Sequence, residues 1–303
     1  MKSKRRTPRP VRIVKRDGRL NIEGLGAWYS YWRDPYHLLL TIPWTGFLAL
    51  IVAGYFATNF LFALVYLAGG NCIANARPGS LTDDFFFSVQ TLATIGYGTM
   101  YPRTYYANSV MTIEVLVGML GVAMATGLAF ARFARPTARV LFSRVAVIAP
   151  QDGVPTLMFR AANERRNTIL EAQMQVRLAC DEVTQEGHFM RRFYELKLVR
   201  SHSPLFALSW TVMHRIDENS PLYGATPESL AAAEAELLVT MNGIDETVVQ
   251  TIHTRHTYAA QELLWNMNFV DILFKDKDGQ RCINYTRFHD VTAVQSGSES
   301  ARY

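Results

Sequence analysis

The first half of the chain is divided into long apolar stretches separated by short polar segments. Residues 38–68 contain no charged side chain and residues 104–131 contain one, so each stretch is long and apolar enough to cross a bilayer. Pro43 interrupts the first stretch. We therefore predict an interfacial helix over residues 34–42, a first span over 43–68 that is about 39 Å long, and a second span over 104–131.

A shorter apolar segment lies between the two spans. Ser80 or Thr82 provides an N-cap, and Asp83 and Asp84 in the first turn match the positive end of the helix dipole. A helix over residues 82–93 has half the length that a spanning helix needs. We therefore predict a re-entrant helix that ends inside the membrane with its negative end directed inward.

The second half of the chain contains short runs rich in β-forming residues. Asp152-Gly153 and Asp278-Gly279 are hairpin-type turns, and Thr226-Pro227 begins one predicted helix over residues 228–235. Regularly spaced strands with turns between them predict a β-sandwich. The predicted strands are 140–148, 156–160, 172–178, 189–199, 206–213, 237–241, 247–253, 263–274 and 281–285.

These patterns divide the chain into three parts. They are an N-terminal arm over 1–33, a membrane domain over 34–136 and a β-domain over 137–303. The 303 residues carry a formal net charge of +5, and the arm holds ten Lys or Arg residues. Basic residues beside a span indicate the cytoplasmic side, and the span that follows at once argues against nucleic-acid binding. No cleaved signal peptide is expected.

Several kinds of chemistry find no support in the sequence. Cys72, Cys180 and Cys282 are scattered without CxxC or metal-ligand spacing. His253 and His256 are too close together in a predicted strand to be a persuasive metal pair. No catalytic or nucleotide-binding motif follows a predicted strand. We therefore expect neither an enzyme nor an organic cofactor.

The strongest candidate site follows the re-entrant helix, at Thr94, Ile95, Gly96, Tyr97 and Gly98. Two glycines one residue apart form poor helix and poor strand, and they permit positive φ, so successive carbonyls can point to one side. Irregular backbone at membrane depth is tolerated where it is buried in protein or lines an aqueous path. Rings of carbonyls can replace the hydration shell of a cation; potassium-channel filters with their TVGYG loops are the known example.

The chain resembles the inward-rectifier potassium channels, and most of all their prokaryotic members. The resemblance covers nearly the whole chain and includes cytoplasmic motifs that other potassium channels lack. The motifs are TIGYG at 94–98, ARFARP at 131–136, RAAN at 160–163, SWTVMHRID at 209–217 and SPLYG at 220–224. Ile95 stands where the typical filter has Val, and it keeps the β-branched apolar shape.

This resemblance implies a homotetramer around one axial pore, with immunoglobulin-like cytoplasmic domains. Potassium ions would pass through the filter and bind at Thr94 to Tyr97. Gates are implied at Phe130 and at Val122, and a hinge at Gly118. Arg132 and Arg135 would bind anionic membrane phospholipids. The implied location is the cell membrane, the inner membrane of a bacterium, crossed more than once with both termini in the cytoplasm.

Some positions depart from the animal members or leave alternatives open. Gln90 and Met100 stand where those members pair a glutamate with an arginine behind the filter. Val122 stands at the position of the rectification acid, so polyamines or Mg²⁺ are expected to block only weakly. Glu114 is either a pore acid or a carboxyl bonded to the pore helix. The alternative function is a non-conducting, membrane-anchored sandwich that acts as a sensor or adhesion module.

Overall fold

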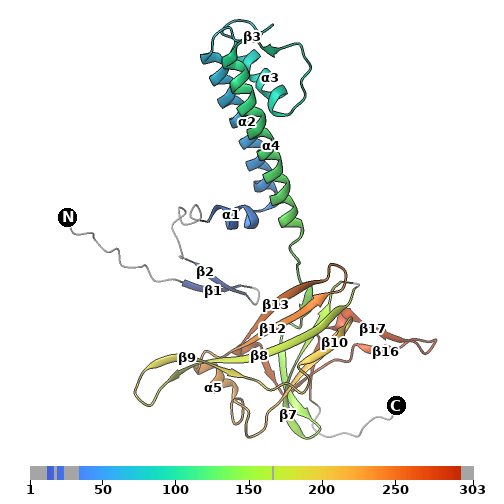
Figure 1. Cartoon of the computed structure of the whole chain (residues 1–303). Helices are drawn as coiled ribbons and strands as arrows, with labels where there is room; N and C mark the ends of the chain where they lie inside the picture. Colours follow the sequence, from blue (N-terminus) through green and yellow to red (C-terminus); the bar gives the residue numbers. More distant parts are fainter. Residues whose placement is uncertain (1–11, 17–18, 24–33, 166, 295–303) are drawn as a thin grey trace. The chain divides into compact units, whose positions relative to one another are not determined.

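The computed structural model describes residues 12–16, 19–23, 34–165 and 167–294, and it separates into two compact units (Figure 1). One unit contains the helices up to Arg135, and the other contains the β-hairpin β1–β2 together with the chain from Pro136 onward. In this hairpin β1 (Arg12–Arg16) pairs antiparallel with β2 (Arg19–Glu23). The sequence Lys15-Arg16-Asp17-Gly18-Arg19 also predicts a tight turn, but its residues 17–18 lie outside the described residues.

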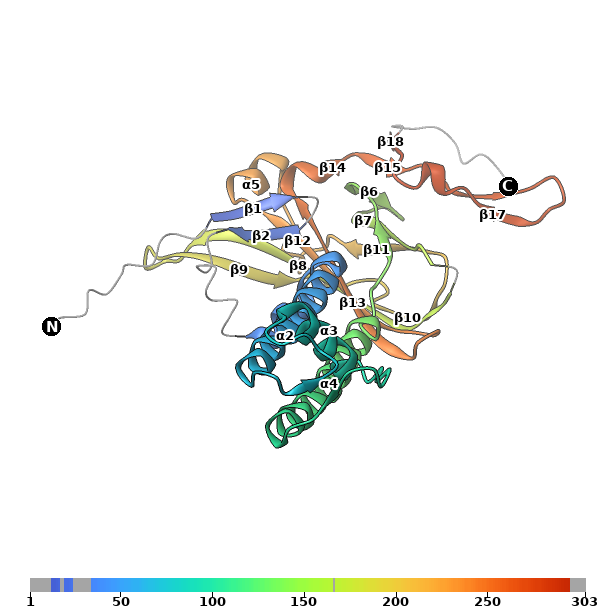
Figure 2. The same ribbon diagram turned by 90° about the horizontal axis from the view of Figure 1, so that it is seen from above.

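Four helices form the described part of the membrane unit, residues 34–135. Two of them, α2 and α4, are long and apolar enough to cross a membrane, as predicted. Figures 1 and 2 show them side by side, with the short helix α3 packed at one end of the pair. The helices are α1 (Pro35–Thr41), α2 (Trp44–Ala68), α3 (Leu81–Leu92) and α4 (Tyr105–Phe133).

The starts of these helices follow from their capping residues. The Asp34 side chain accepts a hydrogen bond from the His37 N–H at 3.0 Å, and Pro43 separates α1 from α2. Of the two candidate caps for the re-entrant helix, Ser80 is the one used, because its hydroxyl accepts from the Asp83 N–H. Thr104 caps α4 in the same way. Side-chain acceptors at these positions satisfy N–H groups that lack a partner within the helix.

The second unit is a β-sandwich, which confirms the predicted architecture. One sheet has the order β10-β8-β12-β13 with β9 beside β8, and the other has the order β11-β7-β6-β14 with β5 beside β7. The strands are β5 (Val140–Phe142), β6 (Ala146–Gln151), β7 (Val154–Asn163), β8 (Ile169–Val183), β9 (Phe189–Glu195), β10 (His202–Phe206), β11 (Ser209–Arg215), β12 (Glu236–Asp245), β13 (Gln250–Ala259) and β14 (Leu263–Trp265).

Smaller elements complete this unit. Helix α5 (Pro227–Ala232) begins at the Thr226 cap, and two short strand pairs and two 3₁₀ turns lie after residue 259 of the described chain. They are β15 (Met267–Phe269) paired with β18 (Val291–Ala293), β16 (Leu273–Lys275) paired with β17 (Arg281–Ile283), and two 3₁₀ turns, Ala260–Glu262 and Tyr285–Arg287.

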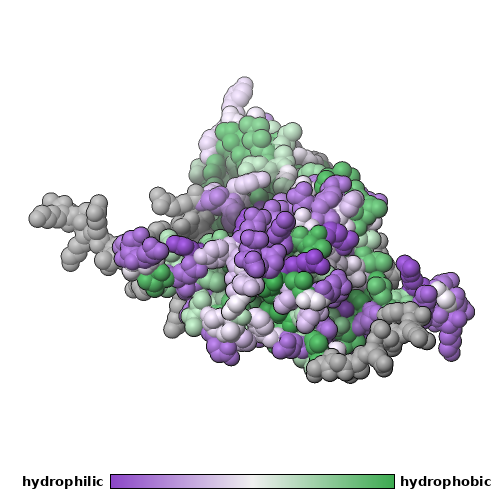
Figure 3. All heavy atoms as spheres, turned by 90° about the horizontal axis from the view of Figure 1, so that it is seen from below, coloured by the Kyte–Doolittle hydropathy of each residue, from purple (hydrophilic) through white to green (hydrophobic). Residues whose placement is uncertain are grey.

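The core of the sandwich is formed by inward-facing side chains of both sheets. Phe159 of β7 and Trp210 of β11 come from one sheet, and Leu178 of β8 and Leu237 of β12 come from the other; all are at least 98% buried. Burial of aromatic and branched side chains at this density supplies the main stabilisation of such a domain. On the face shown in Figure 3, hydrophilic side chains alternate with apolar patches. The tip of the β16–β17 hairpin, residues 275–281, is polar and charged, whereas Leu273 and Phe274 of β16 are exposed apolar side chains.

Several predicted strands are wrong in their extent, and two of them are broken by local backbone geometry. The predicted strand 189–199 ends at Glu195, 206–213 includes the break between β10 and β11, and 247–253 begins in a turn. The run 140–148 splits into β5 and β6, which both pair with β7 but in registers that differ by two residues, so residues 143–145 form a bulge. The run 263–274 is interrupted at Asn266, which has φ of 55° and cannot continue a strand. Neither feature alters the apolar pattern from which strands are predicted.

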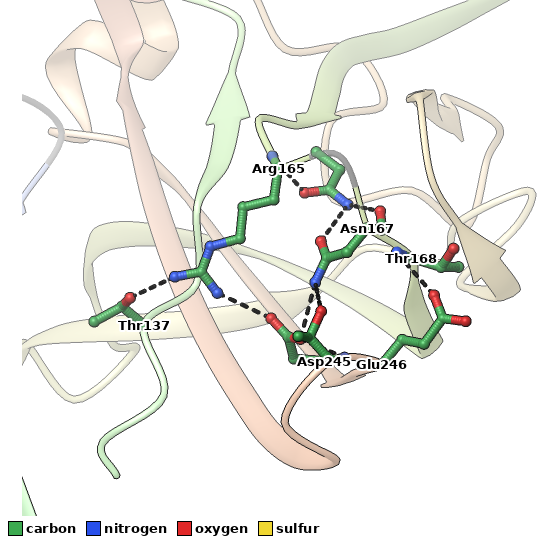
Figure 4. Close-up of polar contacts among 8 residues, drawn as sticks. Thr137, Arg165, Asn167, Thr168, Asp245 and Glu246 are labelled. Carbon is green, nitrogen blue, oxygen red and sulfur yellow. Dashed lines mark hydrogen bonds and ion pairs between the residues drawn. The ribbon is translucent and has the colours of Figure 1, made fainter. Parts of the chain in front are cut away.

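Figure 4 shows a polar cluster that joins three loops of this unit. The carboxylate of Asp245 is 1% exposed and accepts hydrogen bonds from Arg165 at 2.9 Å and from Asn167 at 2.8 Å. The Arg165 guanidinium also donates to the hydroxyl of Thr137 at 2.8 Å. Burial alone raises the pKa of Asp245, but hydrogen bonds from the Thr247 N–H, Asn167 and Arg165 outweigh it and lower the pKa below its usual range.

Candidate functional site

In the segment after α3, the sign of the backbone angle φ alternates from residue to residue. Thr94, Gly96 and Gly98 have φ of 54°, 56° and 80°, whereas Ile95 and Tyr97 between them do not have positive φ. When residues of positive and negative φ alternate, successive carbonyl groups can point to the same side of the chain. In a regular β-strand, successive carbonyl groups point to opposite sides. The arrangement therefore suits a row of carbonyls along one line, which is the chemistry of a dehydrated cation path.

The start of this segment is held by the end of helix α3, which corresponds to the predicted re-entrant helix and is called the pore helix below. The N–H groups of Ile95 and Gly96 both donate to the carbonyl of Gln90, at 2.8 and 3.4 Å. From Thr94 to Gly98 every residue is exposed in the single chain, and Tyr97 is 73% exposed. The segment is thus anchored at its first residues and leaves its remaining surface for other partners.

The loops on both sides of the segment are braced against one another. The Asn75 amide donates to the carbonyl of Thr99 at 2.7 Å, and β3 (Ile73–Ala74) pairs with β4 (Tyr101–Pro102). Arg77 contacts Asp83 at the start of α3 through two hydrogen bonds from its guanidinium, at 2.8 and 2.9 Å. These contacts tie the entry to α3 and the exit from residue 98 into one local structure.

A buried polar network lies behind the pore helix. Ser88 of α3 contacts Glu114 of α4 through a short hydrogen bond and contacts Asn59 of α2 at 3.1 Å. The Tyr66 hydroxyl of α2 donates to the other oxygen of Glu114 at 2.6 Å. All four side chains are fully buried. Glu114 thus faces the pore helix, which was one of the two alternatives that the sequence left open.

Gly118 allows the second long helix to approach the pore helix closely. A Cβ built at this position would lie 2.7 Å from the carbonyl oxygen of Leu92 and 3.1 Å from the Leu92 side chain. At Gly121 and Gly127 a Cβ would meet no atom within 4 Å. Helix α4 runs without a break through all three glycines, so at Gly118 the requirement for glycine comes from packing.

Arg132 joins the end of α4 to the interfacial helix α1. Its guanidinium donates to the carbonyls of Leu39 and Ile42, which have no partner within the helix, and stacks over Trp44 and Phe47 at 4.8 and 4.6 Å. Arg135 is exposed and makes one longer contact, 3.2 Å, to the carbonyl of Leu40. The guanidinium of Arg135 is therefore more available for further contacts than that of Arg132.

The other positions singled out in the sequence lie on the exposed surface of α4. Val122 is 66% exposed and Phe130 is 73% exposed in the single chain. The roles of Asn59, Ser88 and Tyr66 were not predicted from the sequence. The available signal was a polar side chain in an otherwise apolar membrane helix, because such side chains face protein partners.

Comparison with known proteins agrees with this geometry. A family model described as "Ion channel" matches residues 45–135, and one described as "Inward rectifier potassium channel C-terminal domain" matches residues 140–303. The two matches coincide with the helical unit and the sandwich. Together they account for both parts of the structure.

Individual relatives cover almost the full length. The chain is 50% identical over 284 residues to the inward rectifier potassium channel Kirbac3.1 of Paramagnetospirillum magnetotacticum. This match covers 93% of this chain and 96% of that protein. It is 29% identical over 308 residues to the human ATP-sensitive inward rectifier potassium channel 15, covering 92% and 82% of the two chains. The mouse ATP-sensitive inward rectifier potassium channel 12 is also 29% identical, over 310 residues that cover 94% and 72%. The chain therefore belongs to the inward rectifier potassium channel family, and it is an ion channel rather than an enzyme.

Proposed function

We propose that the protein forms a homotetrameric, potassium-selective channel in the inner membrane of a bacterium, with both termini in the cytoplasm. The observation that carries the proposal is the filter segment, whose alternating backbone lies exposed in the single chain. One such strand cannot surround an ion, and irregular backbone is not stable against lipid. Four copies around an axis would bury the segment and complete rings of carbonyls for potassium.

A flux measurement tests this function. The purified protein is reconstituted in liposomes with and without anionic lipid, and potassium and sodium uptake are compared with empty liposomes. Potassium uptake well above sodium uptake is expected, without any added organic cofactor. In detergent the protein should have a mass near four times 34.3 kDa after subtraction of the micelle. A folded protein without potassium flux would favour the non-conducting sensor or adhesion module.

We place the gate at Phe130, with Val122 as a second constriction. An apolar ring of side chains closes a pore by dewetting, so Phe130→Ala is expected to raise basal potassium flux several-fold. Phe133→Ala is the matched control, because the Phe133 ring packs against Trp44 at 4.5 Å and so faces the neighbouring helix. Unchanged flux in Phe130→Ala would move the gate to Val122 or to the filter.

We propose Arg135 as the principal contact for anionic phospholipids, with Arg132 mainly holding helix α1 to α4. An exposed basic residue at the membrane surface gains about 1 kcal/mol from anionic headgroups. Arg135→Gln is therefore expected to flatten the dependence of flux on anionic lipid. Arg132→Gln should in addition change the flux in neutral lipid, because it releases the carbonyls of α1.

Arg139→Gln is the control for this pair, since it removes an exposed arginine a few residues further along the chain. Flux is measured across a series of liposomes with increasing anionic lipid. If the double variant of Arg132 and Arg135 keeps the full response, the lipid site lies elsewhere, for example on the basic N-terminal arm.

Weak block by polyamines or Mg²⁺ follows from the side chains that α4 exposes. Val122 offers no charge to a cationic blocker, and the carboxyl of Glu114 is buried against the pore helix. We expect weak spermine block in the wild type and strong, voltage-dependent block in Val122→Asp. Glu114→Gln should change spermine block little. Tight wild-type block that disappears in Glu114→Gln would contradict this arrangement.

A further inference from the structure

The buried network behind the pore helix contains more oxygen–oxygen contacts than its hydroxyl groups can supply with protons. Its three contacts join Tyr66 to Glu114, Glu114 to Ser88, and Ser88 to Asn59. Each contact between two oxygens needs one proton. Tyr66 and Ser88 carry one hydroxyl proton each, so a third proton is required.

The orientation of the Asn59 amide excludes Asn59 as the source of the third proton. Its Nδ2 group donates to the carbonyl of Tyr55 at 2.8 Å. A flip of the amide would place two acceptor oxygens at that distance, so Oδ1 must face Ser88. Oδ1 has no proton to donate, and the Ser88 hydroxyl therefore donates to Asn59. The short contact between Ser88 and Glu114 is then left without a proton from serine.

The structure assigns the missing proton to Glu114, which acts as a carboxylic acid that donates to Ser88. Every polar atom then has a role: Tyr66 donates to Oε2, Glu114 donates from Oε1 to Ser88, Ser88 donates to Asn59, and Asn59 donates to the Tyr55 carbonyl. Among the described residues no basic side chain forms an ion pair with Glu114. A fully buried carboxylate without a cation is costly, whereas this neutral chain is fully satisfied.

The consequence is a brace between three helices. Glu114 of α4 is a positioning residue that holds Ser88 of α3, while Asn59 and Tyr66 of α2 hold the other ends. Ser88 lies two residues before Gln90, whose carbonyl anchors the start of the filter. The neutral brace thus fixes the pore helix without placing negative charge behind the ion path. This role in filter positioning rests on the proposed conduction; the protonation itself does not.

Infrared spectroscopy of the full-length reconstituted protein tests the protonation directly. We expect a carboxylic-acid C=O band at neutral pH that shifts when glutamate is isotopically labelled and is missing in Glu114→Gln. The label separates Glu114 from buried aspartates such as Asp84, and the variant separates it from other glutamates. Absence of a labelled acid band in the wild type would overturn the proposal, and that measurement requires no variant to fold.

Two variants test the partners. Ser88→Ala removes the acceptor of the Glu114 proton and Tyr66→Phe removes the donor to Oε2, so both should shift the acid band. Ser109→Ala is the control, because among the described residues the Ser109 hydroxyl bonds to the carbonyl of Tyr105 in its own helix and to no member of the network. If the frequency of the acid band is unchanged in both Ser88→Ala and Tyr66→Phe, the proton does not lie in this network.

The functional test compares an isostere with an apolar residue. The amide of Glu114→Gln can donate to Ser88 and accept from Tyr66, whereas Glu114→Leu can do neither. We expect the ratio of potassium to sodium flux to fall severalfold more in the leucine variant than in the glutamine variant. Equal loss in both would overturn the bracing role. If the wild type itself carried no flux, the conduction proposal would fail and the infrared result would stand unaffected.

Discussion

Gly96→Ala is expected to abolish potassium-selective flux while the protein still inserts and folds. Gly96 has φ of 56°, where an alanine costs about 1 to 2 kcal/mol in each subunit. No atom lies within 4 Å of a Cβ at this position in the single chain, so backbone conformation is the main obstacle. Alanine relieves the strain by turning the peptide group, which removes its carbonyl from the line of the pore.

Gly79→Ala is the matched control for Gly96→Ala. Gly79 has φ of 76° and open space at its Cβ, but it lies in the loop before α3. It should incur similar local strain and keep selectivity. The measurement is the ratio of potassium to sodium uptake in liposomes, together with the oligomeric mass. An unchanged ratio in Gly96→Ala would contradict the assignment of the filter.

Gly118→Ala is expected to reduce both potassium flux and the stability of the membrane unit. The added methyl would lie 2.7 Å from the carbonyl oxygen of Leu92, and backbone cannot move aside as a flexible side chain can. Overpacking of this kind costs about 1 to 3 kcal/mol. Because Leu92 is the last residue of α3, the displacement reaches the filter, which begins two residues later.

Gly121→Ala provides the control, since it adds the same methyl group one turn further along α4 into open space. The two variants are compared by thermal unfolding of the tetramer in detergent and by potassium flux. We expect a lower unfolding temperature and lower flux only for Gly118→Ala. If the variants behave alike, the glycine at 118 serves helix bending, and the hinge predicted from the family resemblance gains support.

The elements of the membrane unit were predictable because each is determined by a local pattern. A span needs about 20 apolar residues, and 43–68 and 104–131 provide them. The observed helices differ from these bounds by one or two residues, at capping positions such as Thr104. The short helix α3 followed from its length and its acidic first turn, and the positive φ at Gly96 and Gly98 followed from the freedom of glycine.

The sandwich was predictable in class and less so in its strands. Alternation and turn residues identified most strands, but the bulge at 143–145 and the positive φ of Asn266 divided two of them. Both irregularities depend on how neighbouring strands pair. Strand β18 was not predicted, since three residues are too few to show a period of two.

The sequence by itself determined which segments are long and apolar enough to cross the membrane, which segment is proposed as the filter, and that a β-domain follows. These properties depend on runs of neighbouring residues. Only the tertiary structure decided that Glu114 faces Ser88 and Tyr66, that Gly118 admits the carbonyl of Leu92, and that Arg132 holds helix α1. Each of these contacts joins residues more than 20 positions apart, and its existence depends on how helices pack, which no local pattern of apolar and polar residues specifies.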